Sequence, residues 1–183
     1  MGFRNLILYY IDMPSFTPIR PFQHQLGAGN NQHQITETLT RRTQFRQPVE
    51  QEYLAYLRRV ESALGTGNTM NDKLDDYGFN NLKAFRGSYP YNVMPELKNG
   101  QSCLVNQDRA GQPGVHWFAV CKSRGKLYGY DSFGRKMDNY IHKKVINDTM
   151  DREQLVKQNN CGQRSLAFIH VFEKHGIKKA LQI

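Results

Sequence analysis

Apolar residues along the chain recur with the spacing of helices in two long segments. The first segment starts at Pro48, and proline suits the first turn of a helix. Glycines at positions 65 and 67 should end this helix. The second segment runs from Cys161 to about His175 and carries an apolar stripe on one face. The pattern therefore predicts one helix in the first half of the chain and one near its C-terminal end.

Short runs of apolar and β-branched residues predict strands. Leu6–Ile11 and Gln101–Gln107 are two such runs. His116–Cys121 and Lys126–Asp131 are two more, and the four residues between them (Lys-Ser-Arg-Gly) form a common hairpin connection. We therefore expect a β-hairpin in the middle of the second half of the chain.

The remaining segments have weaker patterns. Met13–Gln47 contains three prolines and little periodicity, which predicts an extended arm. Gly78–Phe85 and Met137–Asp148 have the spacing of helices, whereas Ser88–Leu97 is rich in turn residues. We expect residues 1–70 to form an N-terminal extension (strand, extended arm and one helix) that packs on or covers a core formed by residues 71–183.

Composition fits a globular domain of ordinary size. The chain has 183 residues, 39% of them hydrophobic, and a net charge of +9. Residues 71–183 contain 18 Lys and Arg against 11 Asp and Glu. Such a surface suits nucleic acid or acidic partners, although a solvated basic face would give the same count. No apolar run approaches the roughly 18 residues of a membrane span, so we expect a soluble protein.

The chain contains three cysteines, Cys103, Cys121 and Cys161. They are far apart and form no Cys-x-x-Cys pair, which argues against a disulfide framework and a metal site and favours a reducing compartment. Cys103 and Cys121 lie in strand patterns and should be core or half-buried residues. Cys161 differs because it stands at the predicted start of a helix.

A histidine and an aspartate stand at the open end of the predicted hairpin. If Cys121 pairs with Lys126, then His116 and Asp131 lie directly opposite each other, with Cβ atoms about 5 Å apart. A carboxylate there would fix the imidazole tautomer and leave the other ring nitrogen free as a base. A register slip of one residue would put the two side chains on opposite faces.

Cys161 is a candidate nucleophile, because unpaired N–H groups at a helix N-terminus lower the pKa of a thiol. His170, nine residues on, would be half a turn round the helix and would face away, so His116 is the candidate base. A developing oxyanion would need the Cys161 N–H and a side-chain amide. Gln154 and Gln158 both precede Cys161, and spacing alone does not choose between them.

The segments "GVHWFAV", "YGYDSFGR" and "EQLVKQNNCGQRSLAFIHVF" resemble the adenain-like and SUMO-protease-like cysteine proteases. That family includes maturation proteases of adenoviruses, virophages, Polinton-type elements and some giant viruses. The resemblance covers roughly residues 75–175 and keeps the order His, Asp, Gln, Cys. It implies an α+β fold, a variant of the papain-like clan with a central mixed sheet flanked by helices and the nucleophile at a helix N-terminus. It also favours Gln154 for the oxyanion and Trp117 for substrate binding.

The resemblance implies a cysteine endopeptidase that cleaves viral capsid or core precursors after small residues (Gly-Gly or Gly-x) during virion maturation. Its substrates would be those precursors, and its place the virion and the viral assembly site of the host cell. The chemistry would need no cofactor or metal, although DNA or a short peptide assists the adenovirus enzyme. We expect a monomer that binds no membrane and can contact nucleic acid.

Three alternatives remain at this point. The same site could serve a deubiquitinase or deSUMOylase-type isopeptidase, or an acetyltransferase of the same clan. A third alternative is a basic DNA-binding virion protein on a degenerate protease fold. The intact set of His116, Asp131, Gln154 and Cys161 argues against decay.

Overall fold

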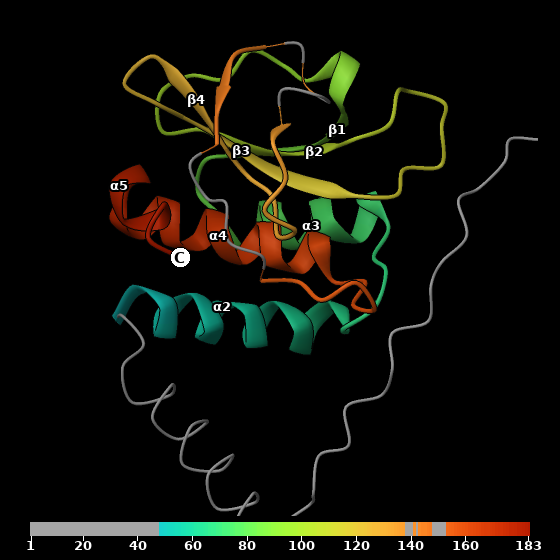
Figure 1. The fold of residues 1–183 in the computed structure, drawn as a ribbon, viewed down its shortest axis with the longest axis vertical. Coiled ribbons are helices and arrows are strands. Elements are labelled where there is room, and N and C mark those ends of the chain that lie inside the picture. Colours follow the sequence, from blue (N-terminus) through green and yellow to red (C-terminus); the bar gives the residue numbers. More distant parts are fainter. Residues whose placement is uncertain (1–47, 138–140, 142, 148–152) are drawn as a thin grey trace, which may run out of the picture. The chain divides into compact units, whose positions relative to one another are not determined.

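A computed structural model describes residues 48–137, 141, 143–147 and 153–183. Five strands form one mixed sheet in the order β1-β2-β3-β4-β5 (Figure 1). The pairs β1/β2 and β4/β5 are parallel, whereas β3 runs antiparallel to both of its neighbours. The expected α+β class with a central mixed sheet flanked by helices is confirmed. The strands are β1 (Phe85–Pro90), β2 (Ser102–Asn106), β3 (Trp117–Ser123), β4 (Lys126–Tyr130) and β5 (Val145–Ile146).

The helix α4 lies between the sheet and α2 (Figure 1). All its residues from Cys161 to Phe172 are buried, because the sheet covers one side and α2 covers the other. No helix in the described part of the chain is long and apolar enough to cross a membrane. The helices are α2 (Pro48–Leu64), α3 (Asn71–Asn81), α4 (Cys161–His175) and α5 (Ile177–Ala180), with a 3-10 turn η1 (Tyr91–Val93).

Alternate side chains of the strands enter two hydrophobic clusters, as the two-residue period of a strand requires. Cys121 belongs to the cluster that contains α2, α3 and α4, whereas Cys103 belongs to the other cluster. Both cysteines are fully buried, which confirms that they are core residues. The second cluster is Met94, Leu97, Cys103, Val105, Phe118, Val120, Met137, Ile141 and Val145.

The helix predicted from Pro48 is confirmed, and it ends at Leu64. Its buried residues belong to the same cluster as α4, so it is part of the core. The Gln163 side-chain amide donates to the carbonyls of Gly65 and Gly67, which holds the turn after the helix. The predicted strand Leu6–Ile11 and the predicted arm 13–47 lie outside the described residues, so the division at residue 70 stays a prediction.

Two of the weaker helix predictions were wrong in part. The helix expected at Gly78–Phe85 is α3, which begins at Asn71, and Phe85 starts a strand that extends into the supposed turn region. A Cβ on Gly78 would lie 2.3 Å from the Phe85 ring, so close packing of helix on strand explains this glycine. Within the helix expected at Met137–Asp148, residues 145–146 form β5 beside β4. Pairing with a distant strand overrides a short helical spacing.

The hairpin of β3 and β4 is present, but its connection is shorter than predicted. Ser123 pairs with Lys126, so only Arg124 and Gly125 form the turn. Both have positive φ, 49° and 76°, as a two-residue turn of type I′ requires. Cys121 consequently pairs with Tyr128 and not with Lys126, a shift of two residues from the predicted register.

Candidate active site

The predicted site residues come together at the open end of the hairpin, next to the start of α4. His116 directly precedes β3, Asp131 directly follows β4, and Cys161 is the first residue of α4. Their exposed fractions are 3%, 0% and 6%, respectively. The site is therefore largely shielded from water, which strengthens electrostatic interactions within it.

His116 and Asp131 form a hydrogen bond, although they are not directly opposite each other. The observed pairing ends at Ala119 and Tyr130, and one further pair in the same register would set Phe118 opposite Asp131, which places His116 one diagonal step away. A shift of two residues keeps every side chain on its face, so the contact survives the error in the predicted register. His116 Nε2 lies 2.7 Å from Asp131 Oδ1, and it donates because a carboxylate accepts.

Asp131 has further donors around it. Its Oδ1 accepts the Phe133 N–H at 2.9 Å, and its Oδ2 accepts from Arg135 Nε at 2.9 Å. Burial raises the pKa of Asp131, but His116 and these donors outweigh burial, so the pKa lies below its ordinary value. Asp131 is therefore a carboxylate at neutral pH. Our sequence reasoning missed Arg135, for which the only signal was a basic residue four positions after the aspartate.

Aromatic rings fix the orientation of the imidazole. The His116 ring centroid lies 4.9 Å from the ring of Phe118 and 4.9 Å from that of Phe133. The Arg135 guanidinium stands 5.8 Å and 5.2 Å from the centroids of the same two phenylalanines. The imidazole thus has little freedom to turn away from Asp131.

The Cys161 thiol and the His116 imidazole interact closely enough for each to shift the pKa of the other. Burial raises the pKa of Cys161, but His116 and the N–H groups of Trp117 and Gly162 lower it below the ordinary thiol value. Burial likewise lowers the pKa of His116, but Asp131 and Cys161 raise it above its ordinary value. These opposite shifts favour a thiolate beside an imidazolium. Because His116 Nε2 is hydrogen-bonded to Asp131, the other ring nitrogen, Nδ1, is the one available to interact with the Cys161 sulfur.

The other cysteines show how unusual Cys161 is. Burial raises the pKa of Cys103 to about 12, and it also raises that of Cys121. Neither would be a thiolate at neutral pH. Among the described residues, no group of three or more His, Cys, Asp and Glu is placed to hold a metal ion.

Gly162 allows α4 to begin close to α3. A Cβ at this position would lie 2.8 Å from Leu74 Cδ2. Leu74 is fully buried, so it has little room to move. Close packing against Leu74 therefore explains why a glycine follows Cys161, whatever the chemistry of the cysteine.

The two candidate glutamines lie in different surroundings. Gln154 is buried, accepts from Ser132 Oγ at 2.6 Å through Oε1, and donates from Nε2 to the Gln158 carbonyl. The Gln158 side-chain oxygen accepts instead from the Leu155 N–H at 2.9 Å and from Arg164 Nη2 at 3.3 Å. The structure therefore holds the Gln154 side chain against Ser132, the neighbour of Asp131, and the Gln158 side chain against Leu155 and against Arg164 of α4.

A buried polar network anchors that segment to the rest of the fold. The hydroxyls of Tyr53 and Tyr130 are 2.8 Å apart, and Tyr130 donates to Glu153 Oε2 at 2.6 Å. Arg164 Nη1 lies 3.9 Å from the same carboxylate oxygen. Burial raises the pKa of Glu153, and the surrounding donors offset only part of this rise. Sequence reasoning missed this network, because its members come from separate elements.

Trp117 lines a small cavity of about 180 Å³. The side chain of Trp117 is half-buried, and its carbonyl accepts from Ser165 Oγ at 3.2 Å. Three large apolar residues next in sequence to candidate site residues are exposed: Val115 precedes His116, and Leu155 and Val156 follow Gln154. The cavity is lined by Thr69, Met70, Asn71, Ser88, Pro90, Asn106, Asp108, Arg109, Gln112, Pro113, Gly114 and Trp117.

His170 has other partners. Its Nε2 lies 3.1 Å from the Tyr77 hydroxyl, and its ring stacks on Tyr56 with centroids 4.6 Å apart. Burial and, to a smaller degree, the charge of Arg59 lower its pKa to about 4. His170 is therefore neutral at physiological pH and packed between aromatic residues.

Comparison with known proteins points to a thiol protease. No family model matches the chain. Over 55 residues the chain is 42% identical to the "Putative thiol protease" of Acanthamoeba polyphaga mimivirus. This match covers 29% of the chain and 18% of the mimivirus protein, so the chain spans less than a fifth of that relative. This similarity to a viral protein suggests a cysteine protease.

Proposed function

We propose that this protein is a cysteine endopeptidase that uses Cys161 as nucleophile and His116 as acid and base. The observation that carries the proposal is the 2.7 Å hydrogen bond between His116 and Asp131, together with the opposite pKa shifts that His116 and Cys161 cause in each other. Such a pair supplies a nucleophile at neutral pH without a metal. The similarity to a mimivirus protein with a thiol protease name supports the same class.

The reaction would proceed in two steps. The Cys161 thiolate attacks the peptide carbonyl and forms a C–S bond, and His116 then gives its proton to the leaving amine as the C–N bond breaks. In the second step His116 takes a proton from water, the hydroxide attacks the thioester, and the C–S bond breaks to restore the thiolate. Asp131 holds the imidazole tautomer and favours the imidazolium.

Two donors would stabilise the oxyanion of each tetrahedral intermediate. The Cys161 N–H has no acceptor within α4, because Cys161 is the first residue of that helix. We assign the second donor to Gln154, whose amide carries two hydrogens and gives one to the Gln158 carbonyl. Ser132 holds the Gln154 side chain by its oxygen, so the NH₂ group is oriented before substrate arrives.

The substrate would bind as an extended segment with small residues at the cleavage point. The cavity beside Trp117, about 180 Å³ in volume, supports this view because it lies below the roughly 300 Å³ at which ligand pockets usually begin. Trp117 would contact the substrate next to the scissile bond. In line with the resemblance in sequence, we propose viral capsid or core precursors, cut after Gly-Gly or Gly-x, as the substrates.

Virion maturation would place the enzyme in the particle or at the viral assembly site. The net charge of +9 supports contact with nucleic acid, which could act as an activator, as could a short peptide. The chemistry itself is complete with the residues of one chain, so a monomer would suffice.

The test combines thiol labelling with a cleavage assay. Iodoacetamide should modify Cys161 near neutral pH, where Cys103 and Cys121 stay unlabelled, and His116→Ala should remove this selectivity. Cys161→Ala should abolish cleavage of an extended Gly-Gly substrate, a loss on the order of 10⁴-fold or more. Cleavage by Cys161→Ala at the wild-type rate would disprove the mechanism. Reaction with a ubiquitin-based probe, or turnover of acetyl-CoA, would instead support an isopeptidase or an acetyltransferase.

A further inference from the structure

A second open cavity lies at the turn end of the hairpin. Its volume is about 620 Å³, within the range of about 300–1,000 Å³ typical of ligand pockets. His116 and Lys122 are six residues apart along the chain, or about 20 Å of extended strand, so this cavity is separate from the candidate active site. We call it the lysine pocket. It is lined by Met94, Pro95, Glu96, Leu97, Lys122, Gly125, Lys126, Leu127, Lys143, Lys144 and Ile146.

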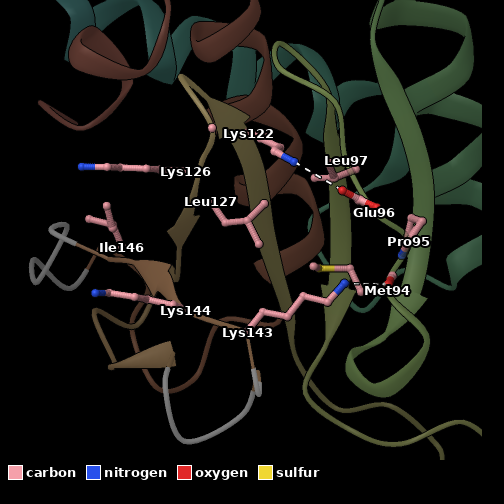
Figure 2. A pocket seen from close by; sticks show the side chains of 11 residues that line it. Met94, Pro95, Glu96, Leu97, Lys122, Lys126, Leu127, Lys143, Lys144 and Ile146 are labelled. Atoms are coloured by element: carbon pink, nitrogen blue, oxygen red, sulfur yellow. Dashed lines mark hydrogen bonds and ion pairs between the residues drawn. The ribbon is translucent and has the colours of Figure 1, made fainter.

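The lysine pocket has an apolar floor. Met94 and Leu97 are buried, and the partly buried Leu127 packs against the same hydrophobic cluster. Figure 2 shows Leu127 between the side chains of Lys122 and Lys143. This cluster lies on the face of the sheet opposite α4. An apolar group that entered the pocket would therefore displace water from the edge of an existing core.

The charged residues among the described lining are four lysines and one glutamate. Lys122 Nζ lies 3.9 Å from Glu96 Oε1, but the Glu96 side chain is 92% exposed, so this ion pair is weak. Lys143 Nζ donates to the Met94 carbonyl at 3.3 Å, a neutral acceptor. Lys126 and Lys144 are exposed, and their side chains extend in the same direction (Figure 2). Among the described residues, the lining of the pocket thus combines an excess of positive charge with an apolar centre.

We propose that the lysine pocket binds an acidic peptide segment of a partner protein, with an apolar side chain on the floor and carboxylates on the lysines. Charge complementarity selects an acidic ligand, and the apolar floor selects a peptide over a bare polyanion. Phosphates of nucleic acid would meet the lysines and leave the floor in contact with water.

Other occupants fit less well. The chain before Pro48 carries five arginines and only two acidic residues, Asp12 and Glu37, so its charge does not complement the lysine pocket. A second copy of the chain carries a net charge of +9 and would be repelled. The ligand should therefore come from another protein.

Fluorescence anisotropy of a labelled peptide, Asp-Glu-Leu-Leu-Glu-Asp, with the full 183-residue chain tests the proposal. We expect saturable binding that weakens with added salt. The double variant Lys126→Gln/Lys144→Gln should weaken binding about tenfold, since each exposed charge pair contributes a few-fold. The matched control Lys178→Gln/Lys179→Gln removes two exposed lysines from α5 and should bind as the wild type does.

Changes on the peptide separate charge from the apolar contact. Replacing both leucines by serine, or all four carboxylates by amides, should each reduce binding at least about fivefold. Cys161→Ala should bind as the wild type does, so the result is independent of the proposed protease activity. Equal loss in both double variants, or unchanged binding of the serine peptide, would overturn the proposal. A second result would also overturn it: a 12-base-pair DNA duplex displaces the peptide, and the Lys126→Gln/Lys144→Gln variant no longer binds that duplex.

Discussion

The two ends of the β3–β4 hairpin differ in how their charges are paired. At the open end, Asp131 is fully buried and its charge meets His116 and Arg135 at 2.7 Å and 2.9 Å. At the turn end, the described lining of an open cavity includes four lysines and one exposed glutamate. The first arrangement is preorganised, because every group in it has its partner before a substrate arrives. The second has charges in excess and suits an external partner.

This difference teaches what each end can do. A buried pair with opposite pKa shifts creates a reactive thiolate, which needs fixed geometry and little water. An open cluster of like charges creates no reactivity, but it attracts ligands of opposite charge and tolerates substitution. We therefore expect substitutions at the open end to act on chemistry and those at the turn end to act on binding alone.

His116→Ala should have the largest effect, because it removes the proposed base and the partner of Asp131 at the open end of the hairpin. We expect the cleavage rate to fall by about 10³–10⁵-fold, since the thiol loses both its base and its counter-ion. The pKa of Cys161 should rise toward or above its ordinary value, because burial then acts without His116. Iodoacetamide labelling rates measured against pH would show this shift. A wild-type labelling profile would refute the role of His116.

Asp131→Asn should have the next largest effect, a loss of about 10²–10⁴-fold in rate. Asp131 raises the pKa of His116, so a neutral side chain lets the imidazolium lose its proton at lower pH. The alkaline limb of the pH–rate profile should therefore move to lower pH. The stability that Asp131 contributes is present above the ordinary carboxyl pKa, so the variant should also unfold more easily at pH 7. An unchanged alkaline limb would contradict the pairing of the two residues.

Glu153→Gln should act more weakly, because this residue anchors the segment before Cys161 and does not touch the reacting atoms. We expect a fall of about threefold to tenfold in kcat with little change in KM. The raised pKa of Glu153 means that wild-type stability from this group falls as pH rises above 4.5. The variant lacks this loss, so its stability relative to the wild type should increase between pH 4 and pH 7. Denaturant melts at both pH values would test the sign.

Lys126→Gln/Lys144→Gln should have the smallest effect on the chemistry, with kcat and KM for a short peptide within about twofold of the wild type. Thermal stability should stay within about 0.5 kcal/mol, as is usual for exposed positions. A large loss of activity with the short peptide would contradict the view that the turn end of the hairpin does not affect the chemistry at the open end. The Lys178→Gln/Lys179→Gln variant serves as the control for a change of two charges.

The sequence predicted the start of α4 and the contact of His116 with Asp131 better than the secondary structure between them. Helix α4 has the predicted bounds, because an apolar stripe that follows a cysteine and glycine identifies a helix start. The contact of His116 with Asp131 was expected for a register that proved wrong by two residues. It formed nevertheless, because a shift of two residues preserves the face on which each side chain lies.

The sequence by itself determined the kinds of group available: a cysteine at a helix start, and a histidine and a carboxylate on one face of a hairpin. Tertiary structure alone decided the rest. It placed Arg135 on Asp131, Ser132 on Gln154, and Tyr53 and Tyr130 on Glu153. It also gathered Lys122, Lys126, Lys143 and Lys144 around one apolar floor. Local patterns report the neighbours of a residue along the chain, whereas these contacts join segments that meet only when the hydrophobic core assembles.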